Sequence, residues 1–368
     1  MDFDLNEDRR MLRDTLEKFL RERYPIEKRL EYSKSEQGYS TKMWQEFADL
    51  GIIGALFDEE AGGFGGQGDD LMVVFEQLGR ALVVEPFLST GILSGTILSA
   101  IGSDLTADVI SGQTQVSLAH SEPASRYDLA HVTTSAEQQG EAWIINGQKS
   151  VVLGAASADK LLVSARTSGT TEDEDGITLF LVEPIASGVE MRAYSTIDGY
   201  GAADIMLTNT PAKPLGEINQ ALPLIELAHA RAIVAVCSQC LGACEVAKDM
   251  TVEYMHTRKQ FGVIIGKFQV LQHRMADVLI ELEQMRSSII NAAGFLDDHR
   301  DLREKHCSAA KNLTGRAGRQ IAEEAIQIHG GIAMTWEASV SHYAKHIIMI
   351  DHLFGDTDHH LERYIELG

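Results

Sequence analysis

The chain has 368 residues, so we expect two or three domains rather than one simple core. It is 44% hydrophobic and 23% charged with only 7 prolines, an ordinary globular composition that argues against extensive disorder. The formal net charge of -22 argues against nucleic acid as a partner, because phosphate backbones select basic surfaces.

The first 113 residues are expected to form an N-terminal helical domain. The chain is charged from Asp2 onward, so we expect no signal peptide. Apolar residues recur at helical spacing from Met11 to Leu20 and mark a later helix from Trp44 to Leu50. The segment 62–68 contains five glycines and must be a loop. We interpret it as an elbow between helices, because it lacks the Lys-Ser/Thr ending of a phosphate-binding loop. Another helix follows, with an apolar stripe from Leu71 to Leu82.

Residues 114–212 change to the period of strands, and we expect a small antiparallel β-domain. The Asn146-Gly147 pair, flanked by strand-forming residues, predicts a hairpin turn. Further strands are expected at 161–165 and 177–182, with Asp204 to Leu207 closing the set. The acidic run 171–175 is expected to be a solvated loop tip.

Residues 213–368 are expected to form a C-terminal bundle of long helices, at about 222–257, 268–295 and 302–329. Long apolar helices in this number indicate a bundle with an oligomer interface. The most apolar run, Ile233 to Val236, is far shorter than the ~20 residues needed to cross a bilayer, so we expect no membrane association.

Three of the four cysteines, Cys237, Cys240 and Cys244, are spaced i, i+3 and i+7 on one expected helix; the fourth is Cys307. This spacing could suit zinc. Because the surrounding residues are apolar, we interpret these cysteines as small buried thiols on a core face and expect no metal site. Reduced thiols indicate a cytoplasmic protein.

Four segments have possible chemical roles. In 257–262 two cations precede a glycine, which is typical of a helix C-cap or of an arginine presented to phosphate beside an aromatic. In 327–332 paired glycines either stop a helix or allow close approach of a ligand. Ser121-Glu122-Pro123 enters the β-domain. The segment 354–360 has two carboxylates and two imidazoles, but the adjacent His359 and His360 should diverge rather than share a metal.

The order and spacing of these segments resemble the acyl-CoA dehydrogenase family over essentially the whole chain. Two of these segments are specific in combination: Arg258 to Gly262 with the following Phe268-Gln269, and, about seventy residues later, Gln327 to Gly331. The marks are the glycine-rich loop, Phe75-Glu76-Gln77-Leu78-Gly79-Arg80, Ser121-Glu122-Pro123, Asn146-Gly147-Gln148-Lys149, Ala158-Asp159, Arg258-Lys259-Gln260-Phe261-Gly262, Phe268-Gln269 and Gln327-Ile328-His329-Gly330-Gly331.

The resemblance implies FAD as cofactor and assigns its contacts by position. Arg258 would reach the pyrophosphate of the FAD in a neighbouring subunit, with Phe261 flanking the cofactor and Gln269 hydrogen-bonded to it. The other implied contacts are Gln327, Gly330 and Gly331 at the adenine-diphosphate portion, Thr357, and the flavin-ring segments Leu118 to Ser121 and Val151 to Leu153, which include Val152. A planar guanidinium suits pyrophosphate, and backbone amides near the ring tune it.

The family oxidises an acyl-CoA to the trans-2-enoyl-CoA: a carboxylate removes the α proton while hydride leaves the β carbon for the flavin. Here the sequence departs from the family pattern. Gly355 stands where the usual base Glu should be, with Asp356 one step later, and Ala232 stands at the other known Glu position. The segment after Pro123 also lacks the common Gly-Ser.

Two accounts of the base follow, and we favour the second. Asp356 could be a shifted base in a self-sufficient homo-oligomer, or it could be only a helix N-cap. Alternatively, the chain is the small subunit of a two-gene dehydrogenase of the pimeloyl-CoA or steroid side-chain type, paired in a heterotetramer with a Glu-bearing paralogue. A flavin-free scaffold is a third hypothesis. The resemblance also implies an electron-transferring flavoprotein or similar acceptor, and a homodimer or tetramer when no paralogue is supplied.

Overall fold

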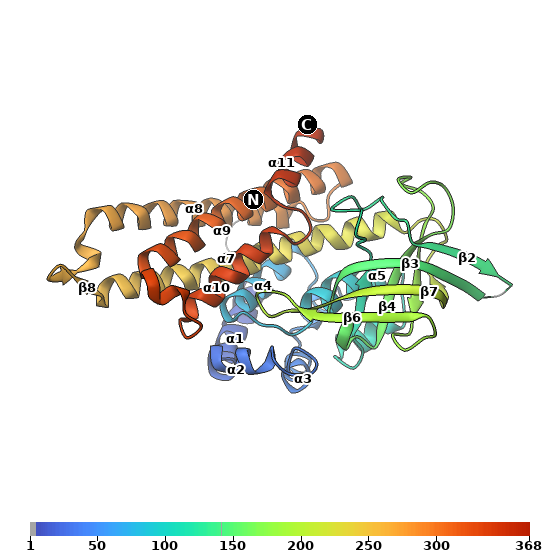
Figure 1. Ribbon diagram of the computed structural model, residues 1–368, viewed down its shortest axis with the longest axis horizontal. Coiled ribbons are helices and arrows are strands. Elements are labelled where there is room, and N and C mark those ends of the chain that lie inside the picture. The colour runs from blue at the N-terminus through green and yellow to red at the C-terminus, as the bar shows by residue number, and fades with distance from the viewer. Residues whose placement is uncertain (1–4, 141) are drawn as a thin grey trace. The chain divides into compact units, whose positions relative to one another are not determined.

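The computed structural model describes residues 5–140 and 142–368. The chain divides into two compact units. One unit, here the helical unit, comprises the N-terminal segment through Leu30, Gln67–Val83 and Ile233–Gly368. The other, here the barrel unit, comprises Glu31–Gly66 and Val84–Ala232. The expected order of helices, strands and helices is confirmed (Figure 1). The three domain boundaries drawn from the sequence stay a prediction.

The N-terminal part is helical, as its apolar spacing predicted. Its helices are α1 (Glu7–Arg23), α2 (Ile26–Tyr32), α3 (Thr41–Asp49), α4 (Gly68–Ala81), the π-helical η2 (Phe87–Ser94), α5 (Gly95–Ala100) and α6 (Leu105–Ile110), with a 3-10 turn η1 (Gly54–Leu56). The glycine-rich segment is a loop between η1 and α4, which confirms the elbow. A Cβ on Gly63 would collide with the carbonyl oxygen of Phe57, so this loop tolerates only glycine there.

The strands of the barrel unit form one seven-stranded sheet. They are β1 (Val116–Ala119), β2 (Ser135–Gln139), β3 (Ala142–Leu153), β4 (Lys160–Arg166), β5 (Ile177–Val182), β6 (Val189–Ser195) and β7 (Gly201–Leu215). The pairings run from β4 through β2, β3, β7 and β5 back to β4, so the sheet closes on an apolar interior that includes Ile145, Val163 and Phe180. The sheet is mixed rather than purely antiparallel, since β1 and β2 pair with β4 in parallel.

The predicted hairpin turn at Asn146-Gly147 was wrong. Strand β3 continues through this pair, and β2 instead pairs antiparallel with the first part of β3, from Ser135 opposite Asn146 to Gln139 opposite Ala142. The pair lies at a register shift, where the side chain of Asn146 accepts the backbone N–H of Asn209 at 2.7 Å. A Cβ on Gly147 would meet Thr134, so the glycine serves close strand approach rather than a turn.

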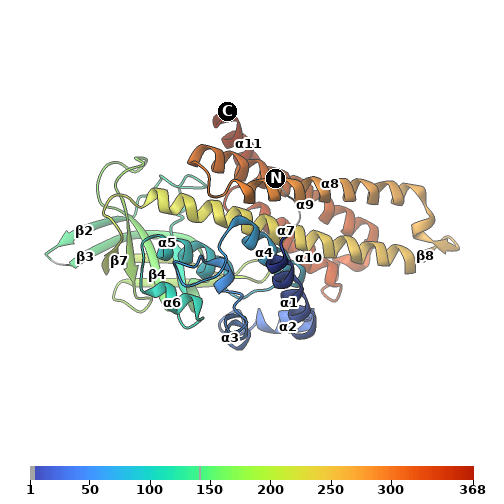
Figure 2. The ribbon, with the colours of Figure 1, turned by 180° about the vertical axis from the view of Figure 1, so that it is seen from behind.

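The three long C-terminal helices have the predicted boundaries within two residues, and two shorter helices follow them. They are α7 (Leu222–Thr257), α8 (Gln269–Gly294), α9 (Arg300–His329), α10 (Ser339–Asp351) and α11 (Thr357–Glu366), with a small hairpin of β8 (Lys259–Gln260) and β9 (Val263–Ile264) between α7 and α8. Within the helical unit, α8 and α9 lie side by side (Figures 1 and 2). Helix α9 also approaches α7, because a Cβ on Gly318 would lie 3.1 Å from Cys240 Sγ.

Helix α4 approaches α7 at backbone distance within the same unit. A Cβ on Gly79 would collide with the carbonyl oxygen of Gln239, and one on Gly242 would collide with that of Glu76. Gly79 in the α4 motif is therefore a packing requirement, because any larger residue there would separate the two helices.

Among the described residues, α7 alone is long and apolar enough to cross a membrane by length and composition, and 83% of its most apolar window is buried inside the protein. The sequence expectation had considered only the short run from Ile233 to Val236. The four cysteines are free and at most 1% exposed, which confirms them as core thiols.

Candidate functional site

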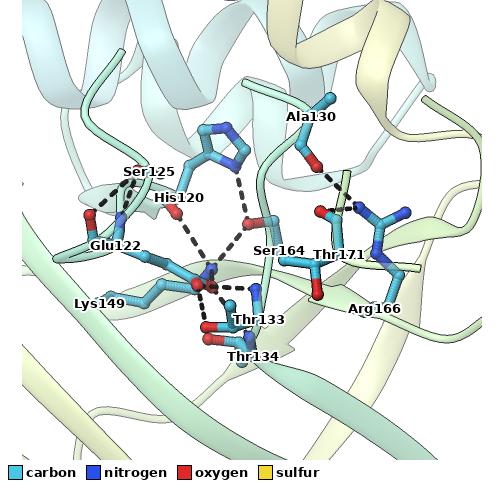
Figure 3. A network of polar contacts seen from close by, with 10 residues as sticks. All are labelled: His120, Glu122, Ser125, Ala130, Thr133, Thr134, Lys149, Ser164, Arg166 and Thr171. Atoms are coloured by element: carbon cyan, nitrogen blue, oxygen red, sulfur yellow. Dashed lines mark hydrogen bonds and ion pairs between the residues drawn. The ribbon is translucent and has the colours of Figure 1, made fainter. Parts of the chain in front are cut away.

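Two sequence motifs of the barrel unit meet in a buried ion pair. Lys149 Nζ on β3 lies 2.8 Å from Oε1 of Glu122, and the two side chains are 0% and 1% exposed. The same ammonium donates to the carbonyl oxygen of His120 at 3.0 Å and to Ser164 Oγ at 3.1 Å (Figure 3). All three ammonium protons thus have acceptors. The ion pair between Glu122 and Lys149 therefore connects the turn after β1 to β3.

Glu122 also organises the segment that follows the Ser-Glu-Pro turn. Its Oε1 accepts the N–H of Thr134 at 3.0 Å, and its Oε2 accepts the N–H of Thr133 at 2.7 Å and the Thr133 hydroxyl. Burial alone would raise the pKa of Glu122, but the charge of Lys149 and these hydrogen bonds lower it to about 2. Burial lowers the pKa of Lys149 to about 8. Sequence reasoning found both motifs but missed their pairing.

His120 is the buried residue directly before Ser121. Its Nδ1 lies 2.8 Å from Ser164 Oγ, and its ring meets that of His229 edge to face at 5.9 Å. Burial first, and then the positive charge of Lys149, hold the pKa of His120 well below its ordinary value. The segment Leu118 to Ser121 therefore contains a buried neutral imidazole, whereas its last residue, Ser121, is exposed.

The second expected flavin segment, Val151 to Leu153, begins in an irregularity of β3. The pairing of β3 with β7 shifts register between Lys149 and Val152, and Val151 has φ +52°. The N–H of Ser150 donates to the carbonyl oxygen of Ser121 at 2.9 Å. The two segments that the resemblance assigns to the flavin ring therefore lie side by side in the barrel unit.

In the helical unit, Arg258 and Phe261 lie on an exposed hairpin. Helix α7 ends at Thr257, and Phe261 and Gly262 form the turn between β8 and β9 with φ +53° and +81°. The interpretation of Gly262 as a helix C-cap was therefore wrong. The turn projects the Phe261 ring into solvent at 93% exposure. The exposed guanidinium of Arg258 has no hydrogen bond or ion pair to any residue that the structure describes.

The expected adenine-diphosphate residues lie at the same end of this unit. Helix α9 ends at His329, whose ring stacks on Tyr254 of α7 at 4.5 Å. Gly330 ends the helix with φ +67°, and the Gln327 side chain is exposed. Several apolar side chains of the β8–β9 hairpin, of the start of α8 and of the segment after Gly330 are exposed: Phe261, Val270, Ile332, Met334 and Trp336.

The C-terminal segment disfavours a side chain at the usual base position. Gly355 has φ +111°, and a Cβ there would lie 2.5 Å from His360 Nε2 and 2.6 Å from His359 Cδ2. The carbonyl oxygen of Gly355 accepts from the buried Lys311 Nζ at 2.6 Å, and Lys311 also donates to the carbonyl oxygen of Asp351 at 3.0 Å. Lys311 of α9 therefore holds the loop between α10 and α11 through two backbone carbonyl groups.

Asp356 is the N-cap of α11, where its carboxylate accepts the N–H of His359 at 2.9 Å. Its neighbour Thr357 donates to Asp351 Oδ1 at 2.8 Å. The structural role weighed for Asp356 is thus observed, and its catalytic role stays a prediction. At the second usual position, Ala232 is 0% exposed.

The expected divergence of His359 and His360 was wrong, because their rings meet edge to face at 5.0 Å. Both nitrogens of His360 have partners, since Nδ1 lies 3.2 Å from Ser308 Oγ and Nε2 lies 2.9 Å from the carbonyl oxygen of Phe354. Burial lowers the pKa of His360 to about 3. Within the described residues no group of three His, Cys, Asp or Glu side chains could hold a metal ion.

The residues present fit the expected cofactor in each unit by itself. The helical unit offers an unpartnered guanidinium beside an exposed aromatic ring, as a pyrophosphate and a flat ring require. The barrel unit offers two adjacent backbone segments for a flavin. Helix α11, with Thr357, lies away from the β8–β9 hairpin in both views of the helical unit (Figures 1 and 2). Thr357 and Arg258 of one chain are therefore not brought together.

Comparison with known proteins finds three matching domain models in chain order. Residues 6–106 match "Acyl-CoA dehydrogenase, N-terminal domain", residues 117–210 match the middle domain, and residues 223–366 match the C-terminal domain. A 3-(aryl)acrylate reductase of Clostridium sporogenes is 30% identical over 300 residues, covering 78% of this chain and 79% of its own.

Two solved structures are similar over nearly the whole chain. The "Tcur3481-Tcur3483 steroid ACAD" has a TM-score of 0.88 at 27% identity, covering 98% of this chain and 97% of its own. The ChsE4-ChsE5 complex from Mycobacterium tuberculosis has a TM-score of 0.89 at 22% identity, covering 100% and 98%. At this identity the second similarity shows the fold alone.

Proposed function

Because the chain belongs to the acyl-CoA dehydrogenase family of FAD-dependent oxidoreductases, we propose that it is the small subunit of a two-component enzyme. In this proposal the chain binds FAD and part of the acyl-CoA site, and a paralogue supplies the carboxylate that removes the α proton. The observation that most supports this division is at Gly355, where a side chain would be strained by the positive φ and would press on the imidazoles of His359 and His360.

A general base must reach the α carbon from a pocket that raises its pKa towards the working pH. The resemblance offers two positions for it. At Gly355 the positive φ and the contact with His360 disfavour a glutamate, and Ala232 has no ionisable group. The nearby Asp356 is engaged as the cap of α11. The three observations together favour a base from another chain.

The cofactor would be shared between subunits. FAD, when bound, supplies the acceptor for the hydride that leaves the β carbon. Arg258 would hold its pyrophosphate through a bidentate contact, and the segments ending at Ser121 and Leu153 would hold the ring. Because α11, which begins at Thr357, lies away from the β8–β9 hairpin that follows Arg258 (Figures 1 and 2), two chains would supply the two contacts. The exposed ring of Phe261, at 93% exposure, is consistent with such an assembly.

The similar structures support the same proposal. The names Tcur3481-Tcur3483 and ChsE4-ChsE5 each join two components, and the former is called a steroid ACAD. We extend the proposal to a carboxylated or steroid side-chain thioester as substrate, an electron-transferring flavoprotein as acceptor, and the cytoplasm as location.

Co-expression with a Glu-bearing paralogue tests whether this chain binds FAD while the paralogue supplies the base. The mixed complex should hold FAD at subunit boundaries and oxidise an acyl-CoA, whereas the chain alone should not. Because one relative is a 3-(aryl)acrylate reductase, the assay should also offer enoyl thioesters with a reduced donor. Robust turnover by the chain alone would favour Asp356 as base in a homo-oligomer. A chain that cannot bind flavin in either setting would favour the scaffold hypothesis.

A further inference from the structure

Strand β3 contains a strained bulge at the start of the segment expected to hold the flavin. Its pairing passes from Lys149 opposite Ile205 to Val152 opposite Ala203, so Ser150 and Val151 together face the single residue Asp204. Val151 has φ +52°, a conformation that a β-branched residue rarely adopts. Bulges re-aim the chain beside functional sites, and a strained residue persists only where its surroundings hold it.

The surroundings of this bulge are specific. Asp204 Oδ1 accepts the backbone N–H of Val151 at 3.2 Å and, on the same oxygen, the hydroxyl of Tyr194 at 3.1 Å. Ser150 is held by the carbonyl oxygen of Ser121 at 2.9 Å. The bulge is therefore fixed from β7 by a side chain and from the end of β1 by the backbone.

The Tyr194–Asp204 contact suits a holding role. Burial, followed by the hydrogen bond and charge of Asp204, raises the pKa of Tyr194 above its ordinary value. The phenol therefore stays protonated at neutral pH and donates to the carboxylate. The held conformation turns the Val151 side chain outward at 47% exposure, whereas the next residue, Val152, is 2% exposed.

We propose that Asp204 and Tyr194 are positioning residues for the flavin, because they hold Val151 in its left-handed conformation and thereby fix the backbone from Val151 to Leu153. The inference rests on the proposed function, since the resemblance places that backbone against the flavin ring. Neither residue belongs to the motifs that mark the family in this sequence. Backbone amides placed beside a flavin set its electronic environment, so loss of the support should alter the flavin as well as its affinity.

The first test compares Asp204→Ala with Glu190→Gln in reconstituted protein. Glu190 is an exposed carboxylate on β6, opposite Met206 and away from the bulge. Asp204→Ala should bind FAD about tenfold more weakly and shift the visible flavin spectrum and reduction potential. Loss of a negative charge alone would strengthen binding of the anionic cofactor, so weaker binding would point to the bulge. Glu190→Gln should match the wild type in all three readouts.

A second variant addresses the strain itself. Glycine adopts positive φ without a steric cost, so Val151→Gly should make the support of Asp204 dispensable. The double variant Val151→Gly/Asp204→Ala should then lose less FAD affinity than Asp204→Ala alone, a non-additivity expected only for coupled residues. If Asp204→Ala alone does not fold, two further variants still test the inference. Val151→Gly/Asp204→Ala should fold and bind FAD, and Tyr194→Phe should weaken FAD binding.

The outcomes are distinguishable. Wild-type protein that binds FAD, with Asp204→Ala equal to it in affinity, spectrum and potential, would overturn this inference and leave the proposed function standing. Additive losses in the double variant would also overturn it. Wild-type protein that takes up no FAD, alone or with a paralogue, would overturn the proposed function and this inference with it.

Discussion

Lys149 Nζ and Glu122 Oε1 form a 2.8 Å ion pair that is sealed from solvent. The pair joins the Ser-Glu-Pro turn to β3, and the two expected flavin segments extend from these anchor points. Removing one partner would leave a buried charge without compensation, whereas removing both can be nearly neutral.

We therefore expect Glu122→Gln to lower the free energy of unfolding by about 3–5 kcal/mol, because the buried ammonium of Lys149 loses its counter-charge. The double variant Glu122→Gln/Lys149→Met should recover most of this loss. Denaturant titration with a far-UV signal measures both.

The matched control is the pair between Lys160 of β4 and Glu183, at 2.5 Å, whose side chains are 28% and 55% exposed. An exposed pair contributes ~0–1 kcal/mol, so Lys160→Met should change stability little. Equal losses at the buried and the exposed pair would show that burial of Glu122 and Lys149 has no energetic consequence.

The pH dependence of stability should report Glu122. Although burial alone would raise its pKa, Lys149 and the hydrogen bonds lower it from 4.5 to about 2 in the folded chain. The unfolded state thus binds the proton more tightly, so the stability that Glu122 contributes is present above about pH 4.5 and is lost as the pH falls toward 2. Between pH 4.5 and 2 the melting temperature of the wild type should fall more steeply with pH than that of Glu122→Gln/Lys149→Met. An equal fall in the two proteins would contradict the assignment.

Gly355→Glu should fail to create a base. The positive φ costs a side chain ~1–2 kcal/mol, and contact with the imidazole of His360 adds an overpacking cost of ~1–3 kcal/mol. Gly38→Ala is the control, because Gly38 has φ +76° but nothing within 4 Å of a Cβ, so it has only the backbone cost. Thermal melts of Gly355→Ala and Gly38→Ala separate the cost of the positive φ from the cost of the contact with His360. A stable, active Gly355→Glu protein would refute the steric argument.

Asp356 should behave as a helix cap. Asp356→Ala should cost ~1 kcal/mol of stability, while Asp356→Asn keeps an acceptor for the N–H of His359 and should cost little. Neither change should affect turnover in the complex with a Glu-bearing paralogue. If Asp356 were the base, Asp356→Asn would keep FAD and slow flavin reduction by about 10²–10⁴-fold.

Arg258→Ala should weaken FAD binding by about ten- to a hundredfold, because a charged contact to phosphate is worth ~1.5–3 kcal/mol. The neighbouring Lys259→Ala is a control for loss of positive charge at the same hairpin and should have a smaller effect. Flavin titration of apoprotein measures both. Full flavin occupancy of Arg258→Ala under dilute conditions would remove Arg258 from the site.

The long helices could be predicted from sequence because their information is local. Apolar periodicity from Leu222 to Thr257 defines a helix whatever it packs against, and the same holds for α8 and α9. The N-cap role of Asp356 is equally local, since the carboxylate bonds a backbone N–H three residues away.

Features that depend on distant partners could not be predicted in this way. Asn146-Gly147 has the sequence of a hairpin turn, but the register with β7 and the close approach of Thr134 make it part of a strand. The 27-residue separation of Glu122 and Lys149 gives no local signal of their pairing. A charged residue in each motif, Glu122 in the Ser-Glu-Pro turn and Lys149 in a strand, was the available hint, because a buried charge requires a partner. The strain at Val151 likewise depends on Asp204, 53 residues later.

Anaerobic titration of the isolated, FAD-loaded chain with a panel of acyl-CoAs tests the central claim most directly. A small subunit that lacks a base should keep its yellow flavin absorbance with every thioester, and bleaching should begin only when a Glu-bearing paralogue is added. Rapid bleaching of the isolated chain by any acyl-CoA, abolished in Asp356→Asn, would contradict the account and establish Asp356 as the base.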